Sequence, residues 1–128
     1  MSAVHRDVDD TVISGGKAAG VPTAVICPPT IHGIGKGPIK KRSLQIPWLT
    51  EAILKRGRGF SVGPGENWWD HVHIDDLANA YILLTEEALK DGGGKAAWGD
   101  DGYYFVENRE YVSYSRPHMH TMICERLT

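Results

Sequence analysis

The chain has 128 residues, of which 41% are hydrophobic and 23% are charged. This composition is ordinary for one soluble globular domain with a core of modest size. A formal net charge of −2 gives no electrostatic reason to expect nucleic acid or an anionic membrane as a partner. No apolar run approaches the roughly 18 residues of a membrane helix, and the polar start MSAVHRDVDD is unlike a secretory signal. The sequence therefore predicts neither a nucleic-acid nor a membrane partner, and it predicts a cytoplasmic protein.

The first third of the chain predicts a helix followed by a buried strand. Residues 7–19 carry apolar side chains at helical spacing, with acidic residues in the first turn, and Gly20 supplies a stop. Residues 23–27 are an uninterrupted apolar run, typical of a strand that is buried on both faces, and Pro28-Pro29 end it. A helix followed by a buried strand is half of a crossover unit in a parallel α/β sheet.

A dense cluster of basic residues follows, from Lys36 to Arg42, and Lys55, Arg56 and Arg58 extend it. Lysine and arginine side chains beside glycines are most often exposed to solvent. We therefore interpret the cluster as a solvated loop, and a loop that contacts a phosphate is the alternative.

The middle of the chain predicts one helix and two extended segments. The helix starts at about Ser43 or Pro47 and runs to Lys55, with Gly57 after its end. Residues 60–62 are predicted to form a short strand, and residues 69–74 form a second extended segment.

The longest helix is predicted to start at Asp75 and Asp76, one of which caps the first turn, and to run to about Lys90. Residues 103–106 predict a last strand. We assign residues 1–108 to one domain, and we interpret residues 109–128, which have little usable periodicity, as an atypical tail for which disorder is one interpretation.

Two motifs in order carry a family resemblance. The run PPTIHGIG at 28–35, placed after the buried strand, and HVHIDDLA at 71–78 resemble segments of the extended short-chain dehydrogenases/reductases, the NAD-dependent epimerase/dehydratase family. Between them, SLQIP at 43–47 and GPGENW at 63–68 are similar to a fungal-type branch. The resemblance covers residues 5–108 and implies the C-terminal portion of such a protein. It implies a partial Rossmann-type α/β fold, a doubly wound parallel sheet, with part of the small substrate-binding lobe.

The resemblance also implies site residues. In that family the proline-led segment passes beside the nicotinamide of NAD or NADP, which makes these residues cofactor-proximal: Pro28, Pro29, Thr30 and Ile31. The substrate would meet these side chains: Ser43, Gln45, Trp68, Trp69 and His73. Two alternatives stay open, namely that the prolines only end a strand and that the tryptophan pair only packs.

Several histidines invite a metal interpretation, which we do not adopt. His71 and His73 point to the same face of a strand, with Asp75 nearby, but a metal needs a third or fourth ligand in fixed geometry. The family motif accounts for His73 and the two aspartates as a helix entry and a hub of hydrogen bonds. We assign no metal, and we assign no chemistry to His32.

The usual cofactor and catalytic motifs are missing from the sequence. No Gly-x-Gly-x-x-Gly turn occurs, although this turn lets the backbone approach the pyrophosphate. No tyrosine is followed four residues later by a lysine, so the family's Tyr-x-x-x-Lys pair is absent and the catalytic residues are unknown.

These observations predict a substrate-side fragment of an oxidoreductase, epimerase or dehydratase, not catalytically complete by itself. The alternatives are a non-enzymatic NAD(P)-sensing relative and a truncated product without independent function. We expect a small-molecule substrate, and a homodimer is one alternative for the oligomeric state.

Overall fold

The computed structural model describes residues 6–61, 63–66, 68–108 and 112–113, and it divides the chain into two compact units. The first unit comprises Met1–Pro28 and Asp76–Val106, and the second comprises Pro29–Asp75 and Glu107–Thr128. The elements of the first unit are α1 (Arg6–Ala19), β1 (Val25–Cys27), most of α3 (Ile74–Ala88), the 3-10 helices η1 (Asp91–Gly93) and η2 (Gly99–Asp101), and β5 (Tyr103–Phe105). The elements of the second unit are β2 (Thr30–His32), α2 (Gln45–Arg56), β3 (Trp68–Trp69), β4 (His71–His73), the start of α3, and β6 (Val112–Ser113).

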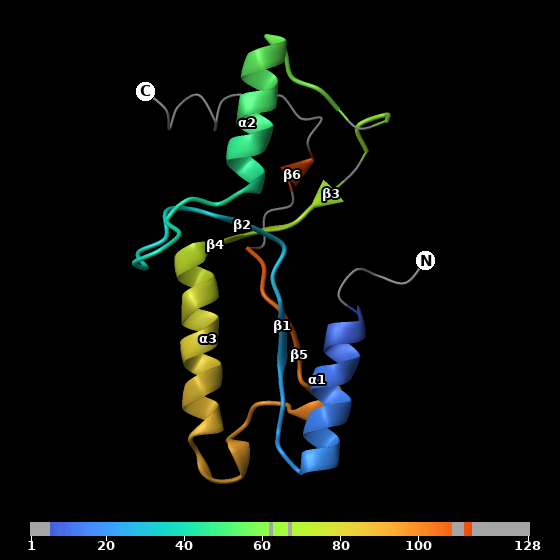
Figure 1. Ribbon diagram of the computed structural model, residues 1–128, viewed down its shortest axis with the longest axis vertical. Coiled ribbons are helices and arrows are strands. Elements are labelled where there is room, and N and C mark those ends of the chain that lie inside the picture. The colour runs from blue at the N-terminus through green and yellow to red at the C-terminus, as the bar shows by residue number, and fades with distance from the viewer. Residues whose placement is uncertain (1–5, 62, 67, 109–111, 114–128) are drawn as a thin grey trace. The chain divides into compact units, whose positions relative to one another are not determined.

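The first unit is built on a parallel pair of strands. β1 pairs with β5, with Val25 opposite Tyr103 and Cys27 opposite Phe105, and in Figure 1 this pair runs between α1 and α3. The hydrogen-bonded ladder extends one residue before β5, because the amide of Val25 donates to Gly102 O at 2.8 Å. Parallel strands with helices on both sides form the partial Rossmann-type α/β fold that the sequence predicts.

The turn from α1 into β1 depends on a close approach at Gly16. This glycine is buried in the last turns of α1, and its carbonyl accepts from the amide of Val21 at 2.9 Å. A Cβ at Gly16 would lie 2.9 Å from Val21 O and would also meet the side chain of Thr23. The helix can reach the strand this closely only without a side chain at that position.

Two neighbouring glycines of α1 therefore give a matched pair of variants. Gly15→Ala is expected to stabilise the chain by about 0.5–1 kcal/mol, because a Cβ there meets nothing within 4 Å and alanine favours the helix. Gly16→Ala is expected to destabilise it by about 1–3 kcal/mol, because the backbone at Val21 has to move. Urea denaturation of both variants measures the difference, and equal effects would contradict the close approach.

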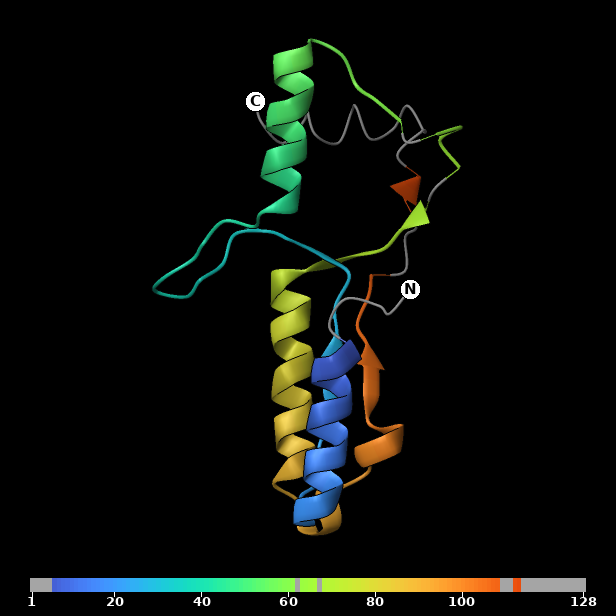
Figure 2. The ribbon, with the colours of Figure 1, turned by 45° about the vertical axis from the view of Figure 1, so that its right-hand side comes forward.

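The second unit is built on another parallel pair, and both views show its β2 and β4 near the start of α3 (Figure 2). β2 pairs with β4, with Thr30 opposite His71 and His32 opposite His73. The side chain of Val72 in the middle of β4 is fully buried. α2 ends at Arg56, and Gly57 follows its end, as predicted. The left-handed φ of 67° at Gly57 lets the glycine amide donate to Leu54 O.

The structure corrects three predicted elements. Phe60 and Ser61 form no strand, and Val62 lies outside the described residues; instead the guanidinium of Arg56 lies over the Phe60 ring, 5.6 Å from its centroid. The extended segment at 69–74 divides into the end of β3 and β4, and Ile74 already begins α3. That helix ends at Ala88, two residues before the predicted end.

The end of the chain is only partly described. β6 pairs with β3 in an antiparallel arrangement, and the remaining residues of the predicted tail, 109–111 and 114–128, lie outside the described residues. The assignment of residues 1–108 and 109–128 to a domain and a tail stays a prediction. None of the helices in the described part of the chain is long and apolar enough to cross a membrane.

Candidate functional site

One face of the β2–β4 pair gathers polar side chains. Thr30 and His32 of β2 lie opposite His71 and His73 of β4, so these four side chains project from the same face of the two strands. The alternate residues project from the other face, where Val72 is fully buried. The buried face holds the strands in place, and the polar face is left for chemistry.

Two histidines on this face are joined directly. His32 Nε2 and His71 Nδ1 are 3.1 Å apart, and the two rings meet edge to face with centroids 5.0 Å apart. The ring of His73 also meets that of His32 edge-on, at 5.2 Å. Because one nitrogen of the bonded pair has to accept, His32 and His71 cannot both be fully protonated while the bond is kept.

His73 starts α3. It precedes the first helical residue, Ile74, and its Nδ1 accepts from the amide of Asp75 at 3.2 Å. This is the bond that an N-cap side chain makes, so the histidine occupies the capping role that the sequence assigned to an aspartate. The ring of His73 also explains why residue 33 is a glycine. Gly33 has a φ of 103°, and a Cβ added there would lie 2.6 Å from His73 Nε2.

The carboxylate of Asp75 is held by a lysine from the loop after β2. Lys36 Nζ donates to Asp75 Oδ2 at 2.9 Å. This hydrogen bond holds the pKa of Asp75 below its ordinary value of 3.8, and the charges of Lys36 and His73 act in the same direction. The pair is exposed, so it fixes the loop to the helix start more than it stabilises the fold.

The outer edge of β4 is completed by a single residue. The amide of His73 donates to Asn108 Oδ1 at 2.8 Å, and the amide of Asn108 donates to His71 O at 2.9 Å. These two bonds replace the two that a neighbouring strand would make. Asn108 therefore clamps the strand that carries His71 and His73, and we call its two hydrogen bonds to this strand the clamp.

Two carboxyl groups meet beside this clamp. Asp70 precedes β4 and Glu107 precedes Asn108. The charge of Asp70, together with a hydrogen bond between the two side chains, raises the pKa of Glu107 above its ordinary value of 4.5. Two close carboxylates repel each other, which favours the protonated form of Glu107.

The backbone of β2 has one edge that faces away from β4. The amide of Thr30 donates to Asp70 O at 3.2 Å, so it faces β4, and peptide directions alternate along a strand. The amide and carbonyl of Ile31 consequently face the other edge, where β2 pairs with no strand among the described residues. Pro29, just before β2, has no amide hydrogen.

The predicted substrate residues lie in three places of the second unit. Ser43 lies in the loop just before α2 and Gln45 begins that helix; the two tryptophans form β3, and His73 lies in β4. The side chain of Trp69 is 52% exposed, whereas that of Trp68 is not among the described ones. None of the hydrogen bonds and ring contacts among the described side chains joins one of these three places to another.

Ser43 belongs to a groove in the second unit. The groove has a volume of about 700 Å³ and lies between the loop at 39–44 and the side of α2 from Pro47 to Lys55. The loop is closed at its base by a bond from the amide of Gly35 to Lys41 O, 2.8 Å long.

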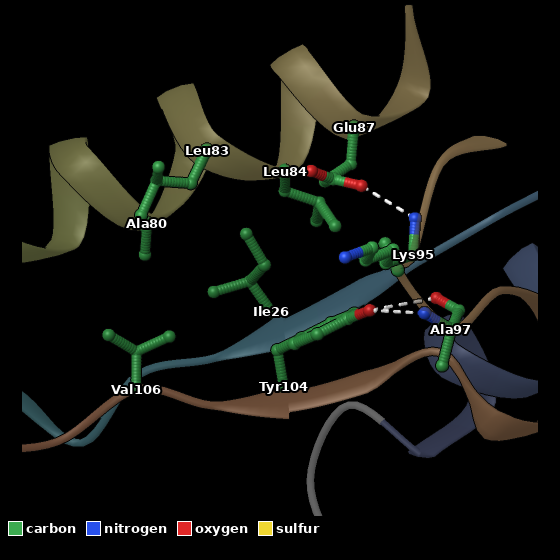
Figure 3. Close-up of a pocket in the computed structure, with 10 residues that line it drawn as sticks. Ile26, Ala80, Leu83, Leu84, Glu87, Lys95, Ala97, Tyr104 and Val106 are labelled. Carbon is green, nitrogen blue, oxygen red and sulfur yellow. Dashed lines mark hydrogen bonds between the residues drawn. The ribbon is translucent and has the colours of Figure 1, made fainter. Parts of the chain in front are cut away.

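The first unit has a pocket of its own, about 550 Å³ in volume, between α3 and the β1–β5 pair. Figure 3 shows Ile26 and Leu84 pointing toward each other across it, with Tyr104 along one wall. The hydroxyl of Tyr104 donates to Ala97 O at 2.9 Å and accepts from its amide at 2.8 Å. The walls are apolar, which is typical of the packing space between a helix and a sheet.

At the rim of that pocket, Glu87 accepts from the amide of Lys95 at 2.6 Å. The hydrogen bond from Lys90 is the main reason that the pKa of Glu87 lies below its ordinary value of 4.5, and the bond from Lys95 adds to it. This carboxylate therefore ties the turn after α3 to the helix.

Sequence comparison decides the family. The model of the NAD dependent epimerase/dehydratase family matches residues 3–96. The chain belongs to this family. The family predicted from the two motifs is thus confirmed, and so is its NAD(P) cofactor, because the family description names NAD.

Two relatives illustrate the range of the family. The chain is 37% identical over 98 residues to the oxidase ucsJ of an Acremonium species, which covers 72% of this chain and 28% of the oxidase. It is 26% identical over 113 residues to 3beta-hydroxysteroid-dehydrogenase/decarboxylase isoform 1 of Arabidopsis thaliana, covering 88% and 24% of the two chains. The chain therefore spans about a quarter of the length of each relative, and no solved structure matches it. The fungal-type branch stays a prediction.

Sequence reasoning missed several residues of the candidate site. Asn108 and Lys36 act through partners far away in the chain, and the His32–His71 bond joins residues 39 positions apart. The glycines after β2 lead into the closed loop at 33–44 and not into a helix start. Among the residues that the structure describes, no three His, Cys, Asp or Glu side chains are arranged to hold a metal ion.

Proposed function

We propose that this chain supplies the substrate side and the nicotinamide-facing edge of an NAD(P)-dependent oxidoreductase that acts on a small hydroxyl or carbonyl compound. Membership of the NAD dependent epimerase/dehydratase family supports the cofactor. The names of the relatives, an oxidase and a dehydrogenase/decarboxylase, favour oxidoreduction over epimerisation or dehydration.

The observation that carries the proposal is the outward edge of β2 at Ile31. A nicotinamide carboxamide has an NH₂ donor and a carbonyl acceptor, and the carbonyl and amide of Ile31 offer the matching pair of groups on that edge. Pro28, Pro29 and Thr30 lead the chain to this position, and we propose all four residues as cofactor-proximal. When bound, the nicotinamide supplies a hydride acceptor or donor.

The chain's own contribution would be to bind and orient. The buried Thr30 and Val72 fix the pair of strands that presents the backbone of Ile31. The histidines project from the same face as Thr30, and the Ile31 side chain projects from the opposite face. We propose that Ser43, Gln45, Trp68, Trp69 and His73 shape the substrate site. Without a Tyr-x-x-x-Lys pair in the sequence, we expect no turnover from this chain by itself.

Cofactor binding is the direct test. We expect saturable quenching of the four tryptophans when the purified chain is titrated with NADH and NADPH. Ile31→Pro removes the outward amide hydrogen and is expected to weaken binding about tenfold, the cost of one hydrogen bond. Ile31→Val keeps the amide and is the matched control. Equal affinity of both variants, with unchanged far-UV circular dichroism, would sink the assignment of this edge.

A second candidate is a relative that senses NAD(P) without turning it over. A full-length protein that has the glycine-rich turn but no Tyr-x-x-x-Lys pair would favour it. The two candidates predict the same binding but differ in chemistry. Transfer of label from 4-deuterated NADH to a carbonyl compound, catalysed by the full-length protein that contains this segment, supports the oxidoreductase and excludes the pure sensor.

A further inference from the structure

The segment around α2 has a charge opposite to that of the chain as a whole. Residues 34–60 contain seven lysines and arginines but one acid, Glu51, whereas the whole chain has a net charge of −2. Glu51 is already paired, because Lys55 Nζ lies 2.7 Å from its Oε1. Lys36 is paired as well, with Asp75. The positive potential of the segment therefore comes from Lys40, Lys41, Arg42, Arg56 and Arg58.

Large apolar side chains lie among these cations and are exposed. The exposed fractions are 92% for Ile39, 74% for Leu54 and 64% for Trp48, and all three line the groove between the 39–44 loop and α2. A patch of this kind that is rimmed by polar groups marks a binding surface more often than a plain solvated face. The sequence-based interpretation of a solvated loop does not account for it.

The two kinds of side chain line one hollow. Lys40, Lys41 and Arg42 of the loop line the same groove as Trp48 and Leu54 of α2. α2 adds to the positive field at its start, since it has no acidic residue in its first turn and no side-chain cap on Leu44. A ligand in this hollow would meet the cations of the loop and, on the helix, the apolar Trp48 and Leu54 beside the paired Glu51 and Lys55.

We propose that this groove binds a small amphiphile with an anionic head group, a carboxylate or a phosphate, and an apolar body. The volume of about 700 Å³ lies in the range of small-molecule sites, roughly 300–1,000 Å³. Lys40, Lys41 and Arg42 hold the head, and Trp48 and Leu54 cover the body. The binding site stands independently of the proposed function. Only the further step, that this amphiphile is the substrate, rests on the proposed function.

The test uses a fluorescent fatty acid, cis-parinaric acid, and its uncharged methyl ester at submicromolar concentration, where both are monomeric. The acid is expected to bind the purified chain about tenfold more tightly than the ester, because only the acid has a charge to pair. The triple variant Lys40→Gln, Lys41→Gln, Arg42→Gln removes that preference and leaves binding of the ester unchanged. Trp48→Ala weakens both probes.

A matched control loses the same charge elsewhere. The triple variant Lys17→Gln, Lys90→Gln, Lys95→Gln changes the first unit only and should bind like the unchanged chain. Equal affinity for acid and ester, or an equal response of the two triple variants, overturns the proposal. Binding to phosphatidylserine vesicles without binding of the monomeric acid also overturns it, since the surface would then be one for a bilayer.

The same samples separate this inference from the proposed function. Acid binding without any response to NADH or NADPH leaves the groove assignment standing and removes the oxidoreductase. A response to cofactor without acid binding removes the groove assignment alone.

Discussion

Val72→Ala is expected to lower the free energy of unfolding of the second unit by about 2–3 kcal/mol. The side chain is fully buried in the middle of β4. The change to alanine removes its two methyl groups with their apolar contacts and leaves a small cavity. Urea denaturation followed by circular dichroism measures the change.

The control for this variant is Leu54→Ala, in the same unit, whose side chain is 74% exposed. It removes more atoms than Val72→Ala, but these atoms are exposed to solvent. It should change the free energy of unfolding by less than about 0.5 kcal/mol. A larger loss for Leu54→Ala than for Val72→Ala would mean that the core of this unit lies elsewhere.

Asn108→Leu is expected to cost about 1–3 kcal/mol, because it leaves the amide of His73 without its acceptor at the edge of β4. Asn108→Asp keeps an oxygen at that position and should lose less. Amide hydrogen exchange reads the bond directly: protection at His73 should fall in the leucine variant and persist in the aspartate variant. Unchanged protection in both would show that the side chain is not the clamp.

Most elements of the fold follow from local patterns in the sequence. The helical spacing of α1, the apolar run of β1 and the glycine that ends α2 predict these elements within about two residues of where they lie. Phe60 and Ser61 were predicted wrongly, because a short apolar run specifies a strand only when a partner strand is available. Here the ring of Phe60 packs under Arg56 instead.

The candidate site was less accessible to sequence reasoning. The motif at 71–78 located His73 and the helix start, but it did not show that the imidazole makes the capping bond. Asn108 gave no signal, since its role depends on where the chain returns after β5. The composition of the basic loop alone predicts a solvated loop. The groove exists because α2 also contributes Trp48 and Leu54 to its lining, which the composition of the loop does not show.

The carboxyl pair beside the clamp has a consequence for proton linkage. Because Asp70 raises the pKa of Glu107 in the folded chain, folding is accompanied by proton uptake at mildly acidic pH. The stabilising contribution of this group is complete below the unfolded pKa and is lost as the pH rises through the folded one. Acidification therefore relieves the repulsion between Asp70 and Glu107 beside β4. It acts in the opposite direction on Asp75, whose lowered pKa makes the ion pair with Lys36 a contribution that is lost as the pH falls.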